Sequence, residues 1–141
     1  LVLVDTSAKN ELSVYLKLGI EDAFRSDESM ANWMVDLAHR NPSEQARRET
    51  LARASQVPRS VAKECLTEFM TRYDVRKRLP TIKAPTLIIV GEKDVMTPPR
   101  MARLLNERIE GSSLEIVPGS KHMPMIDDAV VFNEILLGFL A

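Results

Sequence analysis

The sequence is short of several features that mark whole classes of protein. It holds a single cysteine, Cys65, which excludes an internal disulfide framework and favours a reducing compartment. No apolar run approaches the ~20 residues that a membrane helix needs, and the N-terminus has no signal-peptide pattern. The formal net charge of −1 gives no electrostatic reason to expect nucleic acid or an anionic membrane as a partner. These absences predict a cytoplasmic protein.

Motifs for bound groups are also scarce. The sequence has no cluster with metal-ligand spacing and no glycine loop suited to a phosphate, so we expect neither a metal nor another cofactor. With 141 residues, of which 45% are apolar and 28% charged, the chain is one domain or part of a larger one. It has no initiator methionine and begins inside an apolar strand, LVLVD. The simpler interpretation is a fragment of a longer protein.

The most informative stretch runs from Thr86 to His122 and predicts a strand, an acidic turn, a helix, a second strand and a histidine turn. The apolar run from Leu87 to Val90 is typical of a strand buried on both faces of a parallel sheet. Thr97-Pro98-Pro99 predicts a helix start with a hydroxyl N-cap, and Gly111 marks the stop. A second short strand is predicted from Leu114 to Val117.

Asp94 and His122 stand 28 residues apart, each one turn past a predicted strand. Because the carboxyl ends of parallel strands meet at one edge of a sheet, the acid and the imidazole could meet there. An acid that orients a histidine, which in turn activates a nucleophile, is a standard catalytic arrangement. The alternative is that Asp94 only shapes the turn and that His122 is a surface histidine.

The segment between the first strand and the second is helical in pattern. Apolar positions predict one helix around residues 12–24 and another over 30–38. Asn41 has the form of an N-cap with Glu44 as capping-box acid, and Pro58 opens a fourth helix. A final helix over 130–140 is apolar nearly all round, so it should pack on the sheet.

About seventy residues where a dozen would serve as a crossover suggest a cap or lid rather than a connection. We expect core strand at 1–8, cap at 9–79 and core again at 80–141. Trp33 and the methionines of this block suit an adaptable apolar pocket, although such a helical face is also typical of ordinary core.

Other polar residues have weaker signals. Asp5 ends a strand beside the expected site, where structural capping is the first interpretation and a reserve acid the second. His39 is interpreted as a surface residue near a helix end, and Arg47 and Arg48 as a solvated face. Cys65 lies on an apolar helical face and is expected to be inert.

Two motifs carry a resemblance to a known family. PTLIIVGEKDVMTPPRMARLLNERI and LEIVPGSKHMPMIDD resemble the C-terminal part of α/β-hydrolase fold enzymes, nearest the capped esterase and lactonase group that includes 3-oxoadipate enol-lactonase-like proteins. In that family G-x-x-D carries the triad acid and G-x-x-H the triad base, which implies Asp94 and His122 here. The opening LVLVDT resembles the strand that leaves the core just before the cap. Some members of this fold keep their triad acid at the Asp5 position.

Two departures from the family pattern matter. Lys121 stands where glycine usually precedes the histidine, which could change the freedom of the loop or lower the pKa of the base. The nucleophile elbow G-x-S-x-G is absent, and the serine should precede the acid in this fold. The nucleophile and the oxyanion-hole donors are therefore expected outside this chain. The serines inside it lack an elbow and are poor substitutes: Ser7, Ser112, Ser113 and Ser120.

These observations predict an α/β protein, the C-terminal part of an α/β-hydrolase fold, with three parallel strands, flanking helices and a helical cap. The resemblance implies a serine hydrolase that acts on a small-molecule carboxylic ester or lactone, with the acid and histidine supplied here. The chain alone should be inactive. The exposed edge of its sheet should need to be covered by the missing N-terminal segment or by a second copy of the chain. The alternatives are a non-catalytic binding or two-chain protein, and a dehalogenase-like enzyme with an upstream aspartate nucleophile.

Overall fold

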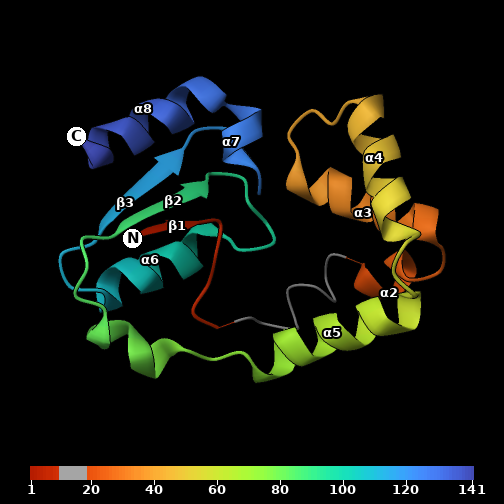
Figure 1. The fold of residues 1–141 in the computed structure, drawn as a ribbon, viewed down its shortest axis with the longest axis horizontal. Helices are drawn as coiled ribbons and strands as arrows, with labels where there is room; N and C mark the ends of the chain where they lie inside the picture. Colours follow the sequence, from red (N-terminus) through yellow and green to blue (C-terminus); the bar gives the residue numbers. More distant parts are fainter. Residues whose placement is uncertain (10–18) are drawn as a thin grey trace.

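The centre of the fold is a parallel sheet of three strands in the order β1-β2-β3 (Figure 1). The computed structural model describes residues 1–9 and 19–141, with the backbone alone for residues 69–71. Strand β1 (Val2–Val4) pairs with β2 (Leu87–Gly91), and β2 pairs with β3 (Ser113–Val117). The three strands therefore end at the same edge of the sheet, as predicted.

Strand β2 is buried over its whole length because helices cover both of its faces. Ile88 and Val90 face one core cluster, which includes Leu105 and Ile109 at the end of helix α6 (Pro99–Arg108). Leu87 and Ile89 face the other cluster, to which helix α8 (Ala129–Leu140) contributes. An unbroken apolar run is what two covered faces require, so the prediction for this strand is confirmed.

Helix α8 packs on the sheet as expected, but with one side only. It packs through four side chains on the sheet: Val131, Phe132, Ile135 and Phe139. Its outer side stays open, with Val130, Leu137 and Leu140 each more than 60% exposed. The apolar pattern all round the helix indicates packing on the sheet correctly, but only one side makes that contact. The short helix α7 (Pro124–Asp127) precedes α8 and was not predicted.

Among the described residues between β1 and β2 there are four α-helices: α2 (Ile20–Ala23), α3 (Asp27–Ala38), α4 (Glu44–Ala54) and α5 (Arg59–Arg72). They form a separate group beyond the carboxyl ends of the strands (Figure 1). A short 3-10 helix, η1 (Arg76–Thr81), leads back to β2. The first predicted helix, over residues 12–24, lies partly outside the described residues. No helix in the described part of the chain combines the length and apolarity needed to cross a membrane.

Two predicted helix starts are displaced. Helix α4 takes Ser43 as its N-cap, whose hydroxyl accepts a hydrogen bond from Ala46 N at 3.1 Å, so Asn41 is not the cap. Helix α6 takes Pro98 as its N-cap, one residue later than the predicted Thr97. In α4 the hydroxyl of Ser43 already satisfies a free N–H of the first turn. The Thr97 hydroxyl has a different partner, described below.

Candidate active site

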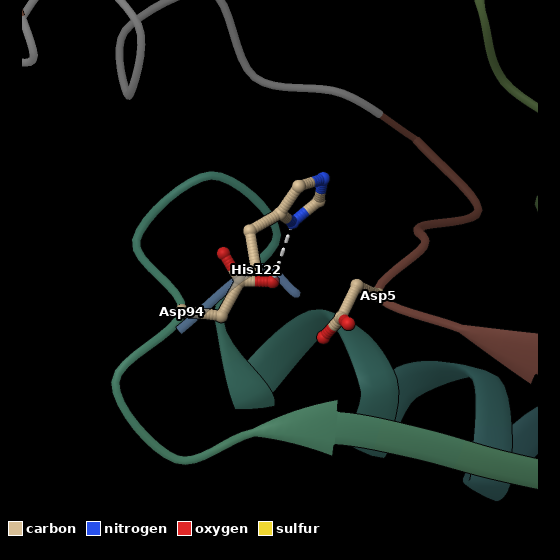
Figure 2. A group of neighbouring side chains, drawn as sticks. All are labelled: Asp5, Asp94 and His122. Carbon is tan, nitrogen blue, oxygen red and sulfur yellow. Dashed lines mark hydrogen bonds and ion pairs between the residues drawn. The ribbon is translucent and has the colours of Figure 1, made fainter. Parts of the chain in front are cut away.

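Asp94 and His122 meet at the carboxyl edge of the sheet, as the spacing predicts (Figure 2). Asp94 follows β2 and is 2% exposed, while His122 follows β3 and is half-buried. His122 Nδ1 lies 2.9 Å from Asp94 Oδ2, a hydrogen-bond distance. The second ring nitrogen points away from both carboxyl groups in the figure.

The two turns that carry these residues are joined through their backbones. Lys93 N donates to Ser120 O at 2.8 Å, and Gly119 N donates to the Glu92 carboxylate at the same distance. Gly91 lies so close to the histidine turn that a Cβ there would be 2.0 Å from Lys121 O. Only glycine permits this approach, so the positions of acid and base depend on each other.

Asp94 accepts four hydrogen bonds, which fills the acceptor sites of a carboxylate. Oδ1 accepts from Met96 N at 2.8 Å and from Thr97 N at 3.0 Å. Oδ2 accepts from Thr97 Oγ1 at 2.7 Å and from His122 Nδ1 at 2.9 Å. The sequence interpretation missed Thr97, whose hydroxyl it assigned to the helix. A threonine three residues after the acid, just before two prolines, is the signal that could have indicated this role.

Electrostatics favours an ionised acid beside this histidine. Burial alone would raise the pKa of Asp94, but the hydrogen bonds from His122 and Thr97 hold it below its usual value. Burial would lower the pKa of His122, yet the hydrogen bond and charge of Asp94, with the charge of Asp5, raise it. An ionised Asp94 makes Nδ1 the donor, which leaves the other ring nitrogen of neutral His122 as an acceptor.

Asp5 lies at the same edge of the sheet, at the end of β1 (Figure 2). Its backbone is in the left-handed region with φ 41°, and Oδ1 accepts from Gly91 N at 3.0 Å. Oδ2 is buried and has no hydrogen-bond partner in the described part of the chain. Burial, first, and then the nearby charge of Asp94 raise the pKa of Asp5 to about 7, although the Gly91 N–H opposes the shift. Asp5 therefore binds Gly91 N and adds a second buried carboxyl group beside His122.

Three potential ligand atoms of Asp5, Asp94 and His122 lie within 4.8 Å of one another. The sequence placed Asp5 beside the expected site but gave no metal-ligand spacing, because the three residues come from three separate strand ends. Both oxygens of Asp94 already accept two hydrogen bonds each, which leaves no lone pair for a cation. The group is better suited to holding and moving a proton.

Lys121 does not place its charge beside the base, which was one of the two effects that the sequence suggested. Its Nζ donates to Asp36 O at 2.6 Å, one of the last carbonyls of α3, and its backbone N donates to Asp127 at 2.9 Å. The ammonium is therefore directed toward helix α3, and the pKa of His122 is raised rather than lowered. Asp127 also accepts from Arg40 N at 2.9 Å. These contacts connect the histidine turn directly with the end of α3.

The remaining candidates lie away from this site or are otherwise engaged. His39 is the C-cap of α3 and is half-buried rather than on the surface. Arg47 forms an ion pair with Asp36 at 2.6 Å and so joins α4 to α3, whereas Arg48 is exposed as expected. Cys65 is exposed on α5.

The candidate serines are hydrogen-bonded, part of a strand or buried. The Ser112 hydroxyl donates to Ile109 O at 2.8 Å, and Ser113 begins β3. Ser7 and Ser120 are buried.

Proteins similar to this chain include esterases. No family model matches the sequence. Over 69 residues, 49% of the chain, it is 36% identical to the pimeloyl-[acyl-carrier protein] methyl ester esterase of Neisseria meningitidis, of which it covers 27%. A thermophilic esterase of known structure is 28% identical, with a TM-score of 0.76 over 99% of this chain and 54% of the esterase.

The chain has the α/β-hydrolase fold. The enol-lactonase from Burkholderia xenovorans shares this fold with a TM-score of 0.72 at 22% identity, over 99% of the chain and 55% of the lactonase. The predicted fold class and the resemblance to esterases are therefore confirmed. The chain spans between a quarter and about a half of the length of these hydrolases.

Proposed function

We propose that the protein containing this chain is a serine hydrolase of carboxylic esters or lactones, with His122 as base and Asp94 as its orienting acid. The observation that carries the proposal is the hydrogen bond between His122 Nδ1 and Asp94 Oδ2, at 2.9 Å, past the ends of neighbouring parallel strands. Open α/β sheets hold their catalytic groups at this edge. The similar proteins reported above are esterases and a lactonase, which agrees with this reaction class.

In this mechanism His122 moves a proton twice. Its free ring nitrogen takes the proton of a serine hydroxyl as the serine attacks the ester carbonyl, and later returns a proton to the departing alkoxide. Ionised Asp94 keeps Nδ1–H in place and stabilises the imidazolium while it exists. Thr97 and the N–H of Met96 fix the carboxylate, so the ring does not have to find its orientation during turnover.

The serine is proposed to lie outside these 141 residues, because no G-x-S-x-G occurs in the sequence and its serines therefore lack a nucleophile elbow. The chain alone should then show no ester turnover. A strand outside this chain, or a second copy, would pair with the free edge of β1. We further propose that residues 9–79 act as a lid over the site. Lys121 and Asp127 would connect this lid to the histidine turn.

Histidine substitution in the intact protein tests the assignment. The chain has two histidines, so His122→Ala can be compared with the matched variant His39→Ala. We expect His122→Ala to lower kcat/KM for p-nitrophenyl acetate by about 10³-fold or more, with His39→Ala near wild type. Near-full activity of His122→Ala would refute the role of this residue.

A serine-directed fluorophosphonate probe tests the nucleophile. The wild-type intact protein should be labelled, and labelling should slow greatly in His122→Ala because the serine then lacks its base. Absence of labelling in a protein that still hydrolyses its substrate would indicate another nucleophile, such as aspartate. Absence of both labelling and hydrolysis would favour a non-catalytic binding protein on the same scaffold.

A further inference from the structure

An apolar cavity of about 370 Å³ lies in the helical segment beside the acid turn. One side of its wall comes from α3 and the end of α2, and another from α5. The acid turn contributes Met96 to the wall. The residues that matter here are Phe24, Met30, Trp33, Ala62, Cys65 and Met96. The volume falls in the range of small-molecule sites.

The cavity is tied to the catalytic acid through one residue. Met96 N donates to Asp94 Oδ1 at 2.8 Å, while the Met96 side chain packs against Ile20 and lines the cavity. The hydrogen bond that orients Asp94 therefore also holds a wall of the cavity in place. A group in the cavity would lie beside the turn that carries Asp94.

The walls define what the cavity can accept. No charged side chain lines it among the described residues. A carboxylate or ammonium would lose its hydration there without a partner, whereas alkyl and aryl groups lose nothing. Methionine and tryptophan adapt to apolar groups of varied shape. The cavity is open to solvent, because Cys65 and Met34, both on its wall, are exposed.

We propose that this cavity binds an alkyl or aryl group of the ester, so that the substrates are apolar esters rather than charged or sugar-like ones. The proposal rests on the function proposed above. It assigns specificity to the wall residues from α2, α3 and α5, and above all to Met96, which joins the cavity to the acid.

Cys65 makes occupancy measurable without any turnover. It is the only cysteine of the chain, so alkylation by iodoacetamide can be followed on its peptide by mass spectrometry. The intact protein carrying His122→Ala should be used, because it should not consume the ester. We expect ethyl octanoate to slow Cys65 alkylation at least about fivefold, and ethyl acetate and disodium succinate to have no effect at the same concentration. Equal rates with and without ethyl octanoate would overturn the proposal.

The second test uses a larger side chain to fill the cavity. Ala62→Phe should lower the ratio of kcat/KM for p-nitrophenyl octanoate over p-nitrophenyl acetate by about tenfold or more, because the phenyl ring takes the space of the chain. Ala52→Phe is the matched control, since Ala52 is exposed on α4 away from the cavity, and its ratio should equal that of wild type.

The two proposals can fail separately. An unchanged ratio in Ala62→Phe with normal acetate hydrolysis would overturn the cavity assignment and leave the hydrolase function standing. If ethyl octanoate protects Cys65 but the wild-type intact protein has no esterase activity, the cavity assignment is supported and the proposed reaction is refuted. If Ala62→Phe does not fold, the Cys65 alkylation rates alone decide whether the cavity binds the apolar ester.

Discussion

Replacing Gly91 with alanine tests how closely the acid turn and the histidine turn are packed. Gly91 is the last residue of β2, and a Cβ built on it would lie 2.0 Å from Lys121 O and 2.6 Å from Ser120 O. Real Cβ atoms essentially never come within 3.0 Å of such atoms, so the backbone of the histidine turn must move by about 1 Å. Backbone cannot rotate away as the end of a flexible side chain can.

The expected effect is large on activity and moderate on stability. A catalytic group misplaced by about 1 Å can cost about 100-fold in rate, so kcat/KM should fall by about that factor. Forcing one extra methyl group into a packed region typically costs about 1–3 kcal/mol. The Gly91 N–H donates to Asp5 and lies in the same contact, so its geometry should change as well.

The assay is ester hydrolysis by the intact protein, followed by urea unfolding of the same samples. Gly138→Ala is the matched control, because a Cβ at Gly138 in α8 meets no atom within 4 Å. That variant should keep its activity and gain about 0.5–1 kcal/mol, since alanine is the better helix former. If Gly91→Ala keeps kcat/KM within about threefold of wild type and an unchanged unfolding midpoint, the close approach of the two turns is wrong.

Two further substitutions test the electrostatics of the site. The pKa of Asp5 is raised in the folded state from 3.8 to about 7, so the stability it contributes is complete below 3.8 and lost as the pH rises through about 7. Asp5→Asn should therefore stabilise the protein by about 2 kcal/mol near pH 8, after allowance for partial solvent screening, and by much less near pH 4, as measured by urea unfolding. It should also move the acidic limb of the kcat/KM profile to lower pH, because the charge of Asp5 helps to raise the pKa of His122; an equal stability change at both pH values would contradict this reasoning. Lys121→Met should destabilise the protein by about 1 kcal/mol, since it removes the cation from the C-terminal carbonyls of α3, while Lys121→Arg should restore the contact. Identical unfolding of Lys121→Met and wild type would show that the contact with α3 contributes nothing.

Most of the core could be predicted because local sequence patterns indicate its strands and helices. The unbroken apolar run of β2 indicates two covered faces, and the helix and strand that follow have clear periods and breakers. These elements place Asp94 and His122 after neighbouring strands. Parallel pairing then brings the two residues to one edge of the sheet, and the resemblance of the G-x-x-D and G-x-x-H motifs to α/β-hydrolases implies which is the acid and which the base.

The errors arose where a residue had two possible partners. Thr97 is a residue type that commonly serves as an N-cap. Its hydroxyl instead donates to Asp94, three residues earlier, and the helix starts at Pro99. Asn41 likewise gives way to Ser43 in α4. A pattern reports what a side chain can bind, and the folded backbone decides which partner lies within reach.

By itself the sequence determined the order of the elements, the apolar faces of the core and the identity of the candidate acid and base, because each depends on residues close together in the chain. Only the tertiary structure decided that Asp5 joins them with a raised pKa, that Lys121 reaches α3, and that Met96 connects the acid to an apolar cavity. These contacts join β1 to β2, the histidine turn to α3, and the acid turn to the helical segment. They form when segments that are distant in the sequence pack together, and the spacing of residues along the chain does not indicate which distant segments will meet.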